Sequence, residues 1–424
     1  MTKTLPPEVV RSLVLYLKDD KKFLHSCLFV SRDWCREAVY LLWKQSFHFL
    51  YTCNKTNLSV SSQSTNLDLE LTNDCNCSKE KRQSQAANLL MTYFSIKYYD
   101  ELIKEGIIDT KSRNTLFNYL KFLNVLSLHE LYVAIKDWIH WDKFDNKIQL
   151  LNFLNSKFNL NSIDILDKYT PLIFSSIFRY FFAYSSELEL LSFDTKFILH
   201  KINNNNPCSF LKYHKILMNE FNELNFPETK QCFVNLTELV LTTDERKNEI
   251  FSLLSRTCHN IQKMSVRVNF HFFSGCGFAI RRENDVALEE AKQLTSLIRS
   301  QHNLIYFELF GTYQVGMSEI LKSLKETQHD SLKTLIFNSV TVDHISYFLF
   351  QLEDFQNLQD LRFIKCIYYE EMDGIDERRN NYGEDLWLPN LKFLQVDCLD
   401  DYQDDFDKLS FILLRCSPLI NEID

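Results

Sequence analysis

The second half of the chain repeats one short pattern, and this repetition restricts the fold more than any other feature of the sequence. The pattern is Leu-x-x-Leu-x-Leu, in which another large apolar residue can replace leucine. Its copies are "NLTELVL", "NIQKMSV", "NLIYFEL", "SLKTLIF", "NLQDLRF" and "NLKFLQV", which begin their apolar series at Leu236, Ile261, Leu304, Leu332, Leu358 and Leu391, after a weaker copy, "ELELLSF", with Leu188, Leu191 and Phe193. Apolar residues two positions apart lie on one face of a strand. Each copy therefore predicts a short strand with one buried face.

Helical periodicity fills the intervals between the copies. Met317, Ile320, Leu321 and Leu324 follow the i, i+3, i+4, i+7 spacing of an amphipathic helix, as do apolar residues within 345–352 and 409–416. The spacing between copies ranges from 25 residues (236 to 261) to 43 residues (261 to 304). One strand–helix unit cannot bury its own apolar face, whereas stacked units share a continuous core and align their strands in parallel. The expected fold class is α/β.

An asparagine precedes most of the predicted strands. The residues concerned are Asn235, Asn260, Asn303, Asn357 and Asn390. Asparagine tolerates the left-handed conformation with which many helices end. We therefore expect these asparagines to form left-handed turns between helix and strand.

The length of the unit and its leucine pattern resemble those of leucine-rich repeats, although aromatic residues often replace leucine here. The resemblance implies an irregular leucine-rich-repeat-like solenoid over residues 183–424 that holds a protein substrate. Residues between the strand leucines alternate away from the core and are the candidate substrate contacts. They are Val240, Glu308, Ile336, Arg362 and Gln395.

The first 47 residues predict three short amphipathic helices. Leu5-Pro6-Pro7-Glu8 suits a helix start, because proline is tolerated in a first turn and an acidic residue favours the positive end of the helix dipole. Val9, Val10, Leu13 and Leu17 mark one face of the first helix. The second amphipathic helix is expected from Leu24, Cys27, Leu28 and Ser31, and the third from Trp34, Ala38, Leu41 and Leu42.

This segment, "LPPEVVRSLVLYLKDDKKFLHSCLFVSRDWCREAVYLLW", resembles the F-box motif. The resemblance implies binding to a Skp-type adaptor and, through it, to a cullin–RING ubiquitin ligase. The adaptor-binding residues that it implies are Leu5, Pro6, Pro7, Val9, Leu13, Leu24, Cys27, Val30, Ser31 and Trp34. A unit of this size is too small to be stable alone and needs a partner surface. Alternatively, its apolar residues form a cap on the repeat array.

The composition suggests two further divisions of the chain. Residues 48–86 are rich in polar residues and are expected to form a flexible linker or loop. Residues 87–182 are expected to be helical and to lead into the repeats. In this region Ser127 and Glu130 have the spacing of a capping box before the apolar face Leu128, Leu131, Ile135 and Trp138.

Charge, cysteine content and hydrophobic patterning indicate which partners, disulfides and location to expect. The net charge is −9 and Lys and Arg form no dense cluster, so we expect no nucleic-acid partner. The acidic stretches within 370–377 and 397–407 predict solvated turns, with attraction of a basic partner as the alternative. The 12 cysteines, including Cys27, Cys258 and Cys416, are too dilute for a disulfide framework. With no signal-peptide or membrane-spanning pattern, we expect a cytoplasmic or nuclear protein without a membrane partner.

The sequence contains only fragments of catalytic and metal-binding motifs. His129-Glu130 lacks the second histidine of a zinc-protease helix because Val133 occupies its position, and Cys75 and Cys77 have the wrong spacing for a zinc knuckle. With seven glycines, a phosphate-binding loop is also not expected. We therefore expect no cofactor, no metal and no catalysis by this chain, but a substrate-receptor subunit of a ubiquitin ligase. The alternatives are an adaptor-bound scaffold without a ligase role and a hydrolase with an unrecognised site.

Overall fold

The chain is an α/β protein. A computed structural model describes residues 5–18, 20–51, 79–94, 117–141, 165–185, 187–192, 232–243, 249–268, 280–311, 317–343, 352, 354–369, 387–398 and 422–423. The chain divides into two compact units. The first contains Met1–Glu220 and Phe226–Cys232, and the second contains Phe221–Asn225 and Phe233–Asp424.

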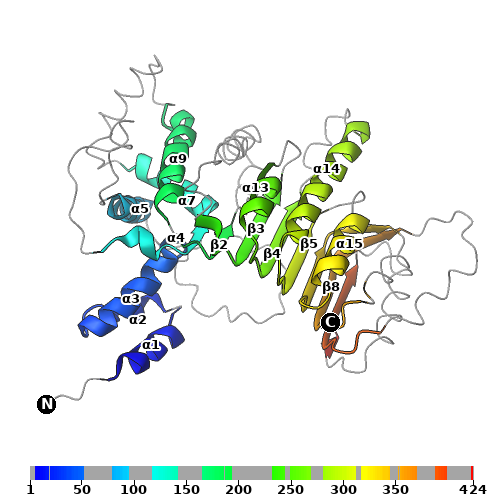
Figure 1. Cartoon of the computed structure of the whole chain (residues 1–424). Helices are drawn as coiled ribbons and strands as arrows, with labels where there is room; N and C mark the ends of the chain where they lie inside the picture. Colours follow the sequence, from blue (N-terminus) through cyan, green and yellow to red (C-terminus); the bar gives the residue numbers. More distant parts are fainter. Residues whose placement is uncertain are drawn as a thin grey trace, which may run out of the picture. The chain divides into compact units, whose positions relative to one another are not determined.

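The first unit begins with three short helices, as the sequence predicts. They are α1 (Pro7–Tyr16), α2 (Lys21–Cys27) and α3 (Arg32–Lys44) (Figure 1). Pro7 lies at the first position of α1. The side chain of Asp20 accepts a hydrogen bond from the backbone N–H of Phe23 at the start of α2. Each helix therefore begins where the local sequence favours a helix start.

The three helices enclose a small apolar core. Val10 and Val14 of α1 are fully buried in it, whereas Val9 and Leu13 are each 41% exposed. The apolar face that we expected for α1 is therefore wrong at Val9 and Leu13. Residues 10 and 14 are four positions apart and share the side of α1 that packs against α3. The buried members of this core are Val10, Val14, Leu24, Cys27, Ala38, Leu41, Leu42 and Phe49.

Further helices and two short strands complete the described part of the first unit. They are α4 (Ser46–Tyr51), α5 (Lys79–Tyr93), the 3-10 helix η1 (Tyr119–Phe122), β1 (Val125–Ser127), α7 (Leu128–Ile139), α9 (Ile165–Tyr184) and β2 (Leu190–Ser192). β1 and β2 pair in parallel. The Ser127 hydroxyl accepts a hydrogen bond from the Glu130 N–H at 3.3 Å, and all four residues of the expected apolar face of α7 are buried.

The linker expected over residues 48–86 differs from the structure at both ends. Residues 48–51 belong to α4 and residues 79–86 belong to α5. Polar residues dominate the first turns of α5, but Ala86, Ala87 and Leu90 are buried and hold the helix against the unit. Residues 52–78 of the expected linker lie outside the described residues.

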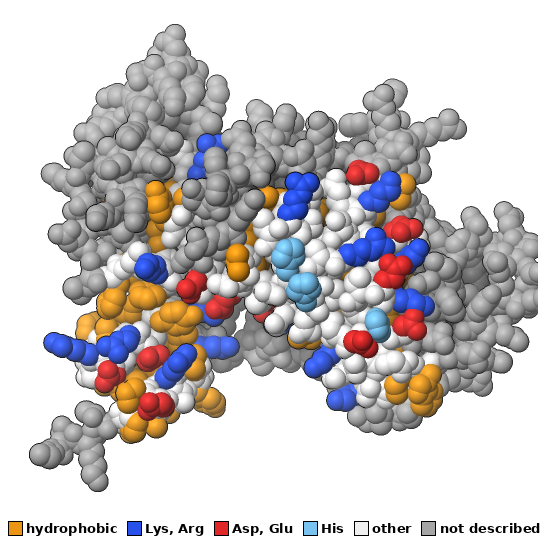
Figure 2. Space-filling model, viewed as in Figure 1, with side chains coloured by type: hydrophobic (Ala, Val, Ile, Leu, Met, Phe, Trp, Pro, Cys, Tyr) orange, Lys and Arg blue, Asp and Glu red, His pale blue; other side chains and the backbone are white. Residues whose placement is uncertain are grey.

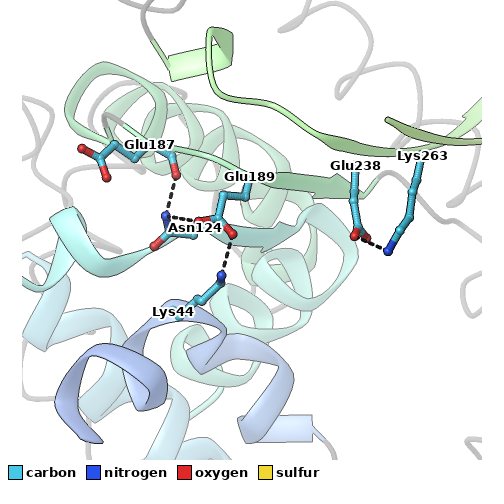
Figure 3. A network of polar contacts seen from close by, with 6 residues as sticks. All are labelled: Lys44, Asn124, Glu187, Glu189, Glu238 and Lys263. Carbon is cyan, nitrogen blue, oxygen red and sulfur yellow. Dashed lines mark hydrogen bonds and ion pairs between the residues drawn. The ribbon is translucent and has the colours of Figure 1, made fainter. Parts of the chain in front are cut away.

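The C-terminal end of α3 packs against the rest of the first unit. The Trp43 ring contacts the rings of Tyr93 and Tyr119, with centroids 5.1 and 4.0 Å away. Lys44 forms an ion pair with Glu189, whose other carboxylate oxygen accepts from the Asn124 amide at 3.2 Å (Figure 3). The amide of Asn124 also donates to the Glu187 carbonyl at 2.9 Å. These contacts join residues far apart in the sequence into one unit.

The second unit contains a parallel sheet in which the described strands are neighbours in chain order. They are β3 (Glu238–Thr243), β4 (Lys263–Val268), β5 (Tyr306–Phe310), β6 (Thr334–Asn338), β8 (Asp360–Tyr369), β9 (Phe393–Cys398) and β10 (Glu422–Ile423), and β7 (Thr341–Asp343) pairs with β8. Helices α13 (Glu249–Thr257), α14 (Ile280–Arg299) and α15 (Met317–Gln328) lie on one side of these strands (Figure 1).

The strand register aligns the repeated apolar residues. One row across the sheet contains Leu239, Met264, Phe307, Leu335, Leu361 and Leu394, all at most 1% exposed. Met317, Ile320, Leu321 and Leu324 are buried in α15 as predicted. Two further predicted helices, over 345–352 and 409–416, lie outside the described residues, except for Leu352, which is buried.

Side-chain amides connect successive repeats. The buried Gln301 accepts from the Ile261 N–H at 3.0 Å and donates to the Cys258 carbonyl at 2.9 Å. Gln328 does the same one repeat later, accepting from the Leu304 N–H and donating to the Gln301 carbonyl. These amides satisfy backbone groups that would otherwise be buried without a partner.

The left-handed turns expected at the asparagines are wrong. The described non-glycine residues with a positive φ are Ser339 and Lys365. Asn357 and Asn390 instead donate from their amides to backbone carbonyls of the preceding repeat, at Asp330 and Gln356, over 2.8 and 2.7 Å. These asparagines therefore act through side-chain hydrogen bonds.

Candidate interaction surfaces

The five predicted substrate contacts occupy one row on the sheet face opposite the repeated apolar residues. In the strand register, Val240, Glu308, Ile336, Arg362 and Gln395 align, and Ser265 of β4 completes the row. We call this row the central row. The adjacent row contains Glu238, Lys263, Tyr306, Thr334, Asp360 and Phe393. Strand alternation places both rows on the same face.

Burial varies along the central row. Val240, Glu308 and Arg362 are half-buried, whereas Ile336 and Gln395 are only 7% and 8% exposed. Ile336 and Gln395 therefore offer less area to a partner than the sequence analysis predicts. Their neighbours Tyr306 and Phe393 are half-buried, and sequence analysis missed them as members of this face. Strand alternation could have found them, because they lie two positions before Glu308 and Gln395.

Three carboxylates in the two rows have different partners. Glu238 forms an ion pair with Lys263 at 2.6 Å (Figure 3). Asp360 accepts two hydrogen bonds from the Arg362 guanidinium, at 2.8 and 2.7 Å. Glu308 accepts from two neutral hydroxyls, Ser265 at 2.7 Å and Tyr306 at 3.0 Å.

Aromatic rings support the cations of this face. The Arg362 guanidinium lies 4.4 Å above the centre of the Phe393 ring, and the Arg267 guanidinium lies 3.9 Å from the centre of the Phe310 ring.

Burial and the neighbouring Glu308 carboxylate raise the pKa of Tyr306 above its ordinary value of 10.0. The hydrogen bonds to Asp360 raise the pKa of Arg362. Tyr306 therefore remains a neutral donor and Arg362 a cation at physiological pH.

The helix-covered face of the second unit has a different character. Figure 2 shows basic and acidic side chains alternating over the helices. Arg299 of α14 pairs with Glu326 of α15 at 2.9 Å, and Lys325 pairs with Asp354 at 2.8 Å. Such mixed charges are typical of a solvated surface. We therefore consider the opposite, strand-lined face the better candidate for binding.

A second candidate surface lies on the first three helices. Figure 2 shows hydrophobic side chains gathered there among charged residues. Val9, Leu13 and Tyr16 follow helical spacing along one side of α1, and Leu5 lies just before this helix. These four residues are between 41% and 87% exposed. Phe29 and Val30, in the turn between α2 and α3, are 88% and 62% exposed. We call Leu5, Val9, Leu13, Tyr16, Phe29 and Val30 the apolar patch residues.

The structure separates the predicted adaptor contacts into exposed and buried residues. Those that are exposed are Leu5, Pro6, Pro7, Val9, Leu13, Val30 and Ser31. Leu24 and Cys27 are at most 1% exposed, so their prediction as direct partner contacts is wrong: they form the core between the helices. Trp34 is half-buried against Phe23, with ring centroids 6.4 Å apart. The Ser31 hydroxyl accepts from the Trp34 N–H and caps α3.

The sequence analysis also missed three exposed residues: Leu15, Tyr16 and Phe29. Tyr16 lies seven positions after Val9 and could have been found by extending the helical spacing. Phe29 lies in a turn, where no periodicity indicates exposure. Its exposure depends on how α2 and α3 meet.

The His129-Glu130 motif has a structural partner, whereas Cys75 and Cys77 lie outside the described residues. Glu130, next to His129, contacts His48 at 3.1 Å in addition to its place in the α7 cap. Among the described residues, no group of three or more His, Cys, Asp or Glu side chains is arranged to hold a metal ion. The helices in the described part of the chain include none with the length and apolarity to cross a bilayer.

Comparisons with known proteins leave the family open. No protein-family model matches the chain, and no significantly similar curated protein is found.

Proposed function

We propose that this chain is an F-box-type receptor subunit of a Skp–cullin–F-box ubiquitin ligase. The first three helices bind a Skp-type adaptor, and the repeat region, a leucine-rich-repeat-like solenoid, holds a protein substrate. The chain contributes no catalytic residue. It raises the concentration of the substrate beside the ubiquitin-loaded enzyme of the complex.

The exposed apolar patch residues are the observation that carries this proposal. Val10 and Val14 already supply the contacts that hold α1 in its unit, so Val9, Leu13 and Tyr16 are not needed for that packing. Exposed apolar side chains that cluster into a patch often mark a protein-interaction site, whereas single scattered ones do not. Burying them against an adaptor removes their apolar area from water.

The strand-lined face supports the receptor part of the proposal. Its central row and the adjacent row combine tyrosine, arginine and phenylalanine with hydrogen-bonding groups. Tyrosine and arginine are enriched among the residues that contribute most to protein-interface affinity. A row that extends across successive parallel strands suits an extended partner.

The test is capture of a purified Skp-type adaptor by the full chain. The double variant Val9→Ser and Leu13→Ser removes two exposed apolar side chains and should reduce capture at least tenfold, because such anchors each contribute about 1 kcal/mol or more. The matched control is Val234→Ser with Trp387→Ser, which removes two exposed apolar side chains from the second unit. Circular dichroism checks that both variants fold.

Three outcomes separate the proposal from its alternatives. Adaptor capture that is unaffected by the α1 variant would contradict the assignment of this surface. Capture of the adaptor without co-purification of a cullin would favour a scaffold without a ligase role. Hydrolysis by the purified chain would favour the enzyme alternative.

A further inference from the structure

Glu308 differs from the other two carboxylates in the central and adjacent rows. Lys263 neutralises Glu238 and Arg362 neutralises Asp360, whereas the hydrogen-bond donors to Glu308 are hydroxyl groups. A hydroxyl orients a carboxylate without cancelling its charge. Glu308 is therefore a half-buried acceptor without a salt-bridge partner among the described residues.

The two hydroxyls fix one oxygen of this carboxylate. Ser265 and Tyr306 both donate to Oε2 of Glu308, at 2.7 and 3.0 Å. Tyr306 projects from the same strand two residues earlier, and Ser265 lies beside Glu308 on the neighbouring strand. Their hydrogen bonds hold the side chain in place and leave Oε1 to accept from another group. Such preorganisation lowers the entropic cost of binding.

The neighbouring cation is engaged elsewhere. Arg362 lies in the same row, but its guanidinium donates two hydrogen bonds to Asp360 and is stacked on Phe393. Its hydrogen bonds therefore go to Asp360, and it interacts with Glu308 only through the attraction of their charges. The aromatic ring of Tyr306 adds a surface beside the carboxylate that favours a cation.

We propose that Glu308 binds the ammonium or guanidinium group of a Lys or Arg in an extended segment held on this face. The proposal deepens the substrate-receptor function above and depends on this face being the substrate site. Charge complementarity determines the occupant: an oriented carboxylate whose hydrogen-bond donors are neutral hydroxyls, beside an aromatic ring, favours a basic side chain over an acidic or apolar one.

The probe is a set of fluorescent seven-residue peptide pools with Lys, Arg, Gln, Glu or Leu fixed at the centre and all other positions randomised. Binding to the full chain is measured by fluorescence anisotropy. The wild type should prefer the Lys and Arg pools over the Gln pool by about tenfold, the typical effect of one charge-assisted hydrogen bond. Glu308→Gln should remove this preference, because glutamine still accepts from Ser265 and Tyr306 but carries no charge.

Two further variants control the interpretation. Glu308→Lys should reverse the preference toward the Glu pool, and Glu319→Gln, an exposed change on α15, should leave the wild-type preference intact. Equal binding of all pools by the wild type, or no binding of any pool, would overturn the proposal, as would an unchanged preference in Glu308→Gln.

The adaptor-capture assay separates this proposal from the function on which it depends. A Glu308-dependent preference in a chain that captures no adaptor would support the basic-residue site and contradict the ubiquitin-ligase role. Adaptor capture without any peptide preference would contradict the site alone.

Discussion

Lys44 and Glu189 form an ion pair across 145 residues of sequence, joining the end of α3 to the segment that enters β2. Asn124 binds the same segment. Its amide donates to the Glu189 carboxylate, and its backbone carbonyl accepts from the N–H groups of Glu189 and Leu190. The helices that carry the apolar patch residues are therefore fastened to the rest of the first unit. A partner bound to them is held by the whole unit.

Asn124→Ala should destabilise the protein more than Lys44→Ala. Asn124 is 2% exposed, and the alanine removes its hydrogen bonds to the Glu187 carbonyl and to the Glu189 carboxylate, each of which contributes about 0.5 to 1.5 kcal/mol. Lys44 and Glu189 are partly exposed, so their ion pair contributes at most about 1 kcal/mol. Urea unfolding followed by circular dichroism compares the two variants. A larger effect of Lys44→Ala would contradict this ranking.

Gln301→Ala should lower the stability of the second unit by about 2 kcal/mol or more. The substitution leaves the Ile261 N–H and the Cys258 carbonyl without their side-chain partner in a buried site. Asn303→Ala, at an exposed position two residues later, is the control and should change stability by less than about 0.5 kcal/mol. Thermal unfolding of both variants provides the measurement, and similar shifts would show that Gln301 does not connect the repeats.

Lys365→Gly should stabilise the protein. Lys365 has a backbone φ of 51°, in the left-handed region, and its exposed side chain gains no burial that would offset the cost. That conformation costs a non-glycine residue about 1 kcal/mol, and the greater freedom of glycine in the unfolded chain cancels part of the gain. We expect a small rise in melting temperature. Gly311→Ala, where φ is 120°, should lower it.

The repeated pattern predicted the strands well because it is a direct consequence of burial. Leu239 and Leu241 face the core and Val240 does not, as alternation requires. The same rule placed Glu308 and Arg362 in one row, since parallel strands in matching register align equivalent residues. It could not identify their partners. Asp360 forms an ion pair with Arg362, whereas Glu308 accepts from two hydroxyls, and this difference depends on side-chain conformations across strands.

The helical segments show where sequence reasoning fails. Val9 and Val10 are equally apolar and adjacent, yet one is exposed and the other buried. Only the packing of α1 against α3 decides between them. Leu24 and Cys27 contribute to the resemblance to the F-box motif by residue type. Such a resemblance does not separate residues that build the unit from those that contact a partner. Gln301 has no sequence signal, because its partners belong to the preceding repeat.

Two buried thiols should make the protein less stable in alkaline solution. Burial raises the pKa of Cys258 and of Cys366 from 9.0 to about 12. Above pH 9 the unfolded chain releases protons from these thiols, while the folded chain retains them. The free energy of unfolding should therefore fall as the pH rises from 9 towards 12, by at most about 1.4 kcal/mol per pH unit for each thiol.

Cys258→Ala isolates this effect from other alkaline titrations. The variant should lose stability less steeply than the wild type between pH 9 and 10.5, although it is less stable at pH 7 because of the lost packing. Cys35→Ala, at a half-buried position, is the control. Identical slopes in the wild type and Cys258→Ala would show that this thiol does not contribute.

Leu335→Asp should unfold the repeat core, whereas Lys333→Asp should be tolerated. Leu335 is 0% exposed and lies between Phe307 and Leu361 in the register, so an aspartate there is a buried charge without a partner and costs several kcal/mol. Lys333 is exposed just before β6, and its contacts to the neighbouring strands run through the backbone, which the substitution keeps. Circular dichroism and urea unfolding compare the two variants.

A strand shifted by one residue would exchange the two faces of the sheet on which its side chains lie, since side chains alternate with a period of two. Equal loss of stability in both variants would therefore contradict the register, and with it the alignment that brings Glu308 and Arg362 into one row.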